Sequence, residues 1–126
     1  MFAQAGSDPM PWSTIAVLSP LLGLAGLVIG WIGIAGGRGR LNRNHIVGIR
    51  TRRTLASDEA WEVAHRAGAR HMIASGAVTI ATAITILFRP SNSAGQIIVG
   101  SGMALMLGFV IASAVAASRA MTRVET

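Results

Sequence analysis

The sequence of 126 residues contains no cysteine, no lysine and no tyrosine, and it has only five acidic residues. The lack of cysteine excludes disulfides and thiolate-ligated metal sites. Charged residues make up 13% of the chain, whereas a soluble domain averages about 25%. The long apolar runs hold no Asp, Glu, Lys or Arg, so a proton or ion relay inside them has no support.

What is present is mainly apolar: 52% of the residues are hydrophobic, and they are collected in three long runs without a charge. An uncharged apolar run of roughly 18 residues or more is typical of a membrane-spanning helix. We therefore predict an all-α integral membrane protein, a single domain over residues 1–126. Its spans are expected at about residues 15–37, 72–88 and 96–118, with a polar connection at residues 38–71.

The basic residues are distributed unevenly. The net charge is +6, all 11 basic residues are arginine, and eight of them lie between Arg38 and Arg70. The tail before the first span has none, the second connection has only Arg89, and Arg119 and Arg123 follow the third span. The positive-inside rule then places the polar connection and the C-terminus in the cytoplasm and the N-terminus outside. Beside membrane spans, this charge indicates contact with anionic headgroups and not with nucleic acid.

The first apolar run differs from a cleavable signal peptide. A signal peptide has a basic N-terminal region and an apolar core of about 7–15 residues. Here no Lys or Arg precedes the run, and the run over residues 15–37 is longer. We expect it to be retained as a membrane span.

Helix-start signals appear well before the second span. Ser57 is a favourable N-cap, and Asp58 and Glu59 fall in the first turn, where the helix dipole favours carboxylates. Glu62 lies four residues before Arg66, the favourable order for an ion pair. We predict one helix of about 30 residues over 57–88, whose first three turns protrude into the cytoplasm or lie along the headgroups.

Small residues recur at intervals of four in the first and third spans. Such stripes let membrane helices approach closely. In the first span they are explained most simply by packing within the chain, with dimerisation as the alternative, and the oligomeric state stays open. The predicted packing residues are Gly26, Gly30, Gly33, Gly37, Ala104, Gly108, Ala112 and Ala116.

The polar connection is rich in guanidinium groups and hydroxyls. Residues 50–54 combine three arginines with two threonines, a composition that suits phosphate or carboxylate capture. The alternative is a solvated basic loop on anionic lipid. We expect headgroup contact from Arg38, Arg40, Arg43, Arg52 and Arg53.

Metal binding and catalysis have little support in the connection. Glu62 and His65 have the Glu-x-x-His spacing of residues that bind iron in some helical bundles. The spans supply no further carboxylates to complete such a site. Three histidines, His45, His65 and His71, are candidate acid–base groups, yet no nucleophile elbow or phosphate loop accompanies them. We predict no metal, no cofactor, no catalytic residue and no enzymatic activity.

A fixed pattern in the connection consists of eight residues: Asn44, Gly48, Arg50, Thr51, Thr54, Ser57, Trp61 and His65. This pattern resembles the signature of the SdpI family of bacterial membrane proteins. The pattern covers about 22 residues and departs from relatives at Arg52, where proline is common. The resemblance implies a multi-pass protein of the bacterial cytoplasmic membrane that protects its producer from a secreted toxic peptide. It also implies, from the founding member, a role in drawing a transcriptional repressor to the membrane.

Two interpretations follow. In the first, an SdpI-type protein protects against a toxic peptide or envelope stress. Gly48 permits a turn, Arg50 and Thr51 bind an anionic group or a backbone carbonyl, and Trp61 and His65 hold the protruding helix against the loop. In the second, the chain is a structural subunit that binds another membrane protein through its small-residue faces, and the basic loop serves only orientation and lipid contact.

Overall fold

The computed structural model describes residues 2–125, and every regular element in that range is helical. The prediction of an all-α fold is confirmed. The elements are α1 (Phe2–Ser7), α2 (Trp12–Gly37), the 3-10 turn η1 (Thr54–Ala56), α3 (Asp58–Ile86) and α4 (Asn92–Glu125). The three long helices are each long and apolar enough to cross a membrane. The chain is therefore a multi-pass membrane protein.

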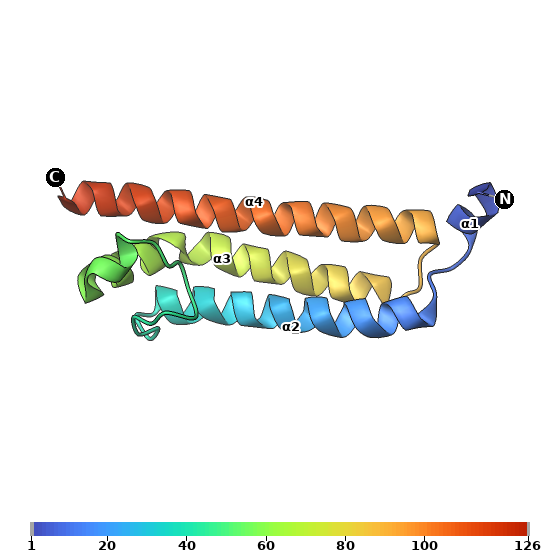
Figure 1. Ribbon diagram of the computed structural model, residues 1–126, viewed down its shortest axis with the longest axis horizontal. Helices are drawn as coiled ribbons and strands as arrows, with labels where there is room; N and C mark the ends of the chain where they lie inside the picture. Colours follow the sequence, from blue (N-terminus) through green and yellow to red (C-terminus); the bar gives the residue numbers. More distant parts are fainter. Residues whose placement is uncertain (1, 126) are drawn as a thin grey trace.

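The three long helices form one layer with α3 in the middle (Figure 1). The backbone of α3 packs against both α2 and α4, and the backbones of α2 and α4 do not approach each other. The polar segment after α2, the start of α3 and the end of α4 gather at one end of the layer. We call this end, with residues 38–57 as its connection, the basic end.

The second span is one continuous helix, as predicted. It has 29 residues, and its first turn carries Asp58 and Glu59. The Ser57 hydroxyl accepts a hydrogen bond from the Ala60 amide at 3.0 Å, which satisfies one of the amides left unpaired at a helix start. The helix therefore begins 14 residues before Met72, the first residue of the apolar run (72 − 58 = 14).

Glycines bring α2 and α3 into backbone contact. A Cβ atom placed on Gly76 would lie 2.6 Å from the Gly30 amide nitrogen and 2.7 Å from the Gly26 carbonyl oxygen. Gly33 packs on Ile73. The Gly37 end of α2 lies against α3 in the same way, on Ala69. The α2 stripe is thus used for packing within the chain.

The contact between α3 and α4 depends on serine hydroxyls. Ser75 Oγ donates to the Met106 carbonyl, and Ser113 Oγ donates to the Gly68 carbonyl, both at 2.9 Å. Ser113 and Ala117 are buried on this face. A hydroxyl that donates to a carbonyl of the neighbouring helix has its hydrogen-bonding requirement met inside the apolar layer.

The predicted stripe on α4 does not form this contact. Ala104 and Gly108 are exposed, and Ala112 and Ala116 are half-buried. A Cβ atom on Gly108 would meet nothing within 4 Å. Contact of this stripe with a helix of another chain stays a prediction.

Two further features were not predicted. α4 begins at Asn92 and continues to Glu125, so it extends beyond the expected span at both ends. At the end opposite the basic end, Pro9 and Ser91 form an isolated antiparallel bridge. Arg89 Nε donates to the Met10 carbonyl at 3.0 Å, and its guanidinium lies 4.9 Å from the centre of a Trp12 ring.

Candidate functional site at the basic end

The connection begins with a turn that Asn44 closes. Its Oδ1 accepts hydrogen bonds from the amides of Ile46 at 2.9 Å and Val47 at 2.7 Å. Asparagine side chains commonly stabilise turns in this way. The chain therefore bends over residues 45–48.

Gly48 has no room for a side chain. Its φ angle is +109°, a conformation that other residues rarely adopt. A Cβ atom there would lie 2.6 Å from His65 Nε2 and 3.0 Å from Trp61 Cη2. The expected turn at Gly48 is present, and its second effect is to let the backbone pass directly over these two rings.

Trp61 anchors the connection to α3. Its side chain is 2% exposed and packs in a cluster with Ala35 and Leu41. Its indole Nε1 donates to the Leu41 carbonyl at 2.7 Å. A buried indole N–H needs such a partner, so Trp61 holds both the start of the connection and the end of α2.

His65 joins α3 to the middle of the connection. Its Nε2 accepts a hydrogen bond from the Ile49 amide at 2.9 Å, and its Nδ1 lies 2.8 Å from the Trp61 carbonyl oxygen. This arrangement requires a neutral ring with the proton on Nδ1. The ring also stacks on Trp61, with centroids 4.2 Å apart.

The environment of His65 favours that neutral form. Burial lowers the pKa of His65 from its ordinary value of 6.5, while the hydrogen bond to the Trp61 carbonyl acts in the opposite direction. His65 precedes the apolar run of α3 and faces the connection. Because its pKa in the folded chain is below the unfolded value, the stability that it contributes is present above pH 6.5 and is lost as the pH falls through the lowered pKa.

Two threonines form the last part of the connection. Thr54 is fully buried, and its hydroxyl accepts from the Thr51 amide at 2.8 Å and donates to the Ile49 carbonyl at 2.8 Å. Thr51 Oγ1 accepts in return from the Thr54 amide at 3.2 Å. These reciprocal bonds start η1, which leads into the Ser57 cap of α3.

The arginines of the connection have different surroundings. Arg50 donates to the His45 carbonyl within the connection. Arg43 donates to the Leu55 carbonyl at 3.1 Å and lies 3.3 Å from the Asp58 carboxylate. Arg53 reaches α4, where its guanidinium donates to the hydroxyls of Ser118 at 3.2 Å and Thr122 at 3.1 Å. Of the residues expected to contact headgroups, four are exposed and Arg53 is half-buried; the exposed ones are Arg38, Arg40, Arg43 and Arg52.

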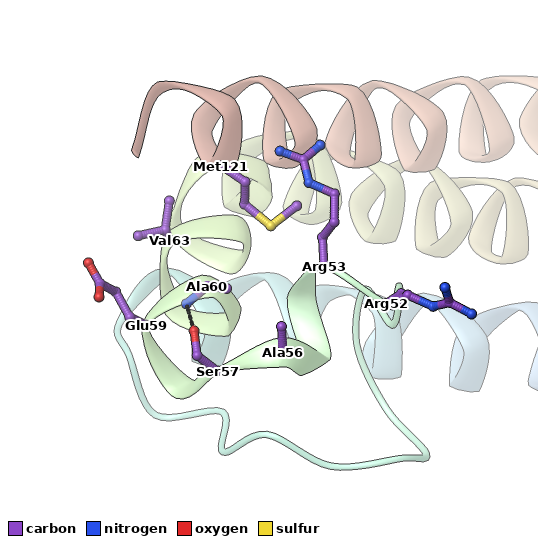
Figure 2. A pocket seen from close by; sticks show the side chains of 8 residues that line it. All are labelled: Arg52, Arg53, Ala56, Ser57, Glu59, Ala60, Val63 and Met121. Atoms are coloured by element: carbon purple, nitrogen blue, oxygen red, sulfur yellow. Dashed lines mark hydrogen bonds between the residues drawn. The ribbon is translucent and has the colours of Figure 1, made fainter. Parts of the chain in front are cut away.

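Two cavities are lined in part by Arg53. The larger, of about 370 Å³, is lined by Arg52, Arg53 and the first turns of α3 (Figure 2). The smaller, of about 310 Å³, lies between the connection and α4 and shares Arg52, Arg53 and Met121 with the larger one. In Figure 2 Arg53 points toward α4, whereas Arg52 points away from it along the helices.

Two acidic residues of α3, Asp58 and Glu62, form ion pairs on the surface. Glu62 Oε1 accepts from Arg66 at 2.9 Å, which confirms the predicted pair. Among residues 2–125, no three His, Asp or Glu side chains lie close enough together to hold a metal ion.

The structure thus brings the pattern residues together at one site. Asn44, Gly48, Thr51, Thr54 and His65 determine the path of the connection, with Trp61, Ser57 and Arg50 around them. Sequence reasoning missed the partners elsewhere in the chain, above all Leu41, Ser118 and Thr122. One signal was available: Ser118 and Thr122 are four residues apart and so share a helix face.

Comparison with known proteins identifies the family. The model of the SdpI/YfhL protein family matches residues 40–117, from the connection to the third span. No curated protein and no solved structure matches the chain. The matched region covers more than half of the chain and includes all eight pattern residues. The chain belongs to the SdpI/YfhL protein family.

Proposed function

We propose that this chain is a non-enzymatic protein of the bacterial cytoplasmic membrane that protects the cell against a toxic peptide or envelope stress. In this proposal the basic end lies in the cytoplasm and the N-terminus lies outside, as the positive-inside rule predicts. The connection is the working surface, and its partner is a toxic peptide or a cytoplasmic regulator. The observation that carries the proposal is that the family's pattern residues fold the connection against α3.

The internal hydrogen bonds separate this proposal from the solvated-loop alternative. A loop that only sets orientation needs arginines, but it does not need a buried Trp61, a neutral His65 or the left-handed Gly48. Each of these positions makes a contact that other residue types do not reproduce. Ordered loops on a helical scaffold are common binding surfaces. The connection resembles such a binding surface more than it resembles a loop that only sets the orientation of the spans.

Protection is tested in a strain that lacks the gene and carries either the wild-type chain or a variant. We expect Trp61→Ala and Arg50→Ala to reduce survival at least about tenfold on challenge with membrane-active peptides, since both changes alter the folded connection. Trp31→Ala and Arg40→Ala make the same chemical changes at exposed positions and should protect fully. Immunoblotting confirms equal abundance.

The proposal fails if Trp61→Ala and Arg50→Ala protect cells as well as the wild type at normal abundance. A result in which all four variants lose protection equally would also count against it, because the effect would then not be specific to the folded connection.

One observation favours a second candidate, a subunit that binds another membrane protein. Gly100 and Gly108 on α4 have open space where a Cβ atom would lie, and Ala104 between them is exposed. Close helix contact in membranes uses such surfaces. If this candidate is correct, Gly108→Leu abolishes protection in the same assay while Arg50→Ala does not.

A further inference from the structure

One large apolar side chain of the connection is almost fully exposed. Ile46 is 81% exposed, whereas the other large apolar side chains of residues 38–71 are buried or half-buried. The turn that carries it is ordered, because Asn44 Oδ1 accepts from the Ile46 amide at 2.9 Å. Arg50 donates to the His45 carbonyl and so joins the two sides of the turn. The connection thus presents Ile46 from a fixed backbone conformation.

The end of α2 gives the depth of this turn in the membrane. The uncharged run of α2 ends at Gly37, and Arg38 follows it. A Cβ atom on Gly36 would lie 2.9 Å from His65 Cβ, and one on Gly48 would lie 2.6 Å from His65 Nε2. Gly48 is therefore within the length of one His65 side chain of the end of α2. Because such a run ends where hydrocarbon gives way to headgroups, Gly48 lies at the edge of the hydrocarbon.

The third span gives the same depth independently. The uncharged run of α4 ends at Ser118, before Arg119. Ile49 packs against a buried cluster that includes Ala64 and Ala117, so it lies next to the last residues of this run. Figure 1 shows the connection folded back beside the end of α2 and the start of α3. Both outer helices therefore place the connection at the membrane boundary and not in the water beyond it.

We infer that Ile46 inserts into the bilayer leaflet at the basic end and anchors the connection to the acyl chains there. Ile46 is two residues from Gly48, so its Cα lies within about 7 Å of the hydrocarbon edge even in an extended chain. The headgroup layer is itself about 5–8 Å thick on each side. A side chain at this depth leaves water by entering lipid, whereas a cytoplasmic protein would have to displace headgroups to reach it. The inference goes beyond the proposed function, since insertion involves no toxic peptide, no regulator and no arginine charge.

Insertion is tested with one nitroxide label on the full chain in vesicles of phosphatidylcholine, which has no net charge. The chain has no cysteine, so Ile46→Cys introduces the sole thiol. Oxygen concentrates in hydrocarbon, so the ratio of collisions with oxygen to collisions with a water-soluble nickel chelate should be at least about threefold higher at position 46 than in Glu59→Cys. Glu59 is exposed and lies about 9 Å beyond His65 along α3. Ile34→Cys, inside the apolar run of α2, should resemble Ile46→Cys.

The unlabelled thiols give a second measurement, because a nitroxide is itself apolar. Each thiol is treated with an uncharged and with a charged maleimide, and the ratio of the two rates cancels differences in thiol acidity. This ratio should be at least about fivefold higher for Ile46→Cys than for Glu59→Cys.

Three results would overturn the inference. A nickel collision rate at position 46 as high as that at Glu59 would show a side chain in water, available to a cytoplasmic partner. Low collision rates with both oxygen and nickel would show that protein covers Ile46, either a second copy or another part of the chain. Equal maleimide ratios at the two thiols would show that lipid does not shield position 46.

Discussion

Gly76→Ala is expected to destabilise the folded chain by roughly 1–3 kcal/mol, the usual cost of overpacking a tight contact. The added methyl carbon would lie 2.6 Å from the Gly30 amide nitrogen and 2.7 Å from the Gly26 carbonyl oxygen. Both are backbone atoms, so neither can turn aside as a flexible side chain would. α2 and α3 must move apart, and dispersion contacts along their interface are lost. Thermal unfolding of the purified chain in detergent measures the effect.

Gly108→Ala is the matched control. It also adds one methyl group to a glycine within a long helix, but its Cβ atom would meet nothing within 4 Å. Inside a helix, alanine is more favourable than glycine by roughly 1 kcal/mol. The Gly108→Ala variant should therefore be at least as stable as the wild type. If Gly76→Ala and Gly108→Ala lower the stability by the same amount, the backbones of α2 and α3 are not in contact at Gly76.

Trp61→Ala is expected to have the largest effect in the connection, roughly 3–5 kcal/mol of lost stability for that region. The substitution empties the cluster with Ala35 and Leu41. It also removes the donor to the Leu41 carbonyl and the ring that stacks on His65. Limited proteolysis should then cut residues 38–57 rapidly, while the membrane-spanning helices stay intact.

Trp31→Ala controls for the loss of an indole ring. Trp31 lies in α2 and is 55% exposed, so its removal empties no cluster and should leave the cleavage rate of the connection unchanged. Slow cleavage of residues 38–57 in Trp61→Ala would mean that the connection does not depend on this anchor.

Local signals determined much of the fold. Ser57 was recognised as the cap of α3 because the cap, the two acids after it and the uninterrupted helix pattern all lie within a few residues of one another. The ion pair of Glu62 with Arg66 is equally local. Three spans were readable because a bilayer requires long uncharged runs. These features depend on residues that are close together in the sequence and not on the packing of the helices.

The packing of α4 could not be predicted in the same way. α4 is apolar on nearly all sides, so hydrophobic periodicity does not distinguish the face on α3 from the face on lipid. The stripe of Ala104 and Gly108 was the more regular pattern. The contact is instead made by Ser113 and by Ser75 of α3, whose hydroxyls need acceptors on the opposite helix.

The roles of the pattern residues in the connection were predicted only in outline. Trp61 and His65 were expected to hold α3 against the connection, and the structure gives the atoms that do so. Their partners, the Leu41 carbonyl and the Ile49 amide, are backbone groups 20 and 16 residues away. Nearly every residue has a backbone amide and a carbonyl, so the sequence does not indicate which of them form these hydrogen bonds.

The central claim is that the connection is a folded part of the protein, held to α3 by neutral His65. Amide hydrogen exchange of the full chain in lipid bilayers tests it most directly, at pH 7.5 and over a series of lower pH values, with correction for the intrinsic pH dependence of exchange. The amides of Val47, Ile49 and Thr51 should be protected at pH 7.5 because each has an acceptor. Protection of Ile49 should fall as the pH is lowered through the reduced pKa of His65, because the protonated ring has no acceptor nitrogen. Exchange of these amides at the rate of an unfolded chain at pH 7.5 would contradict the account.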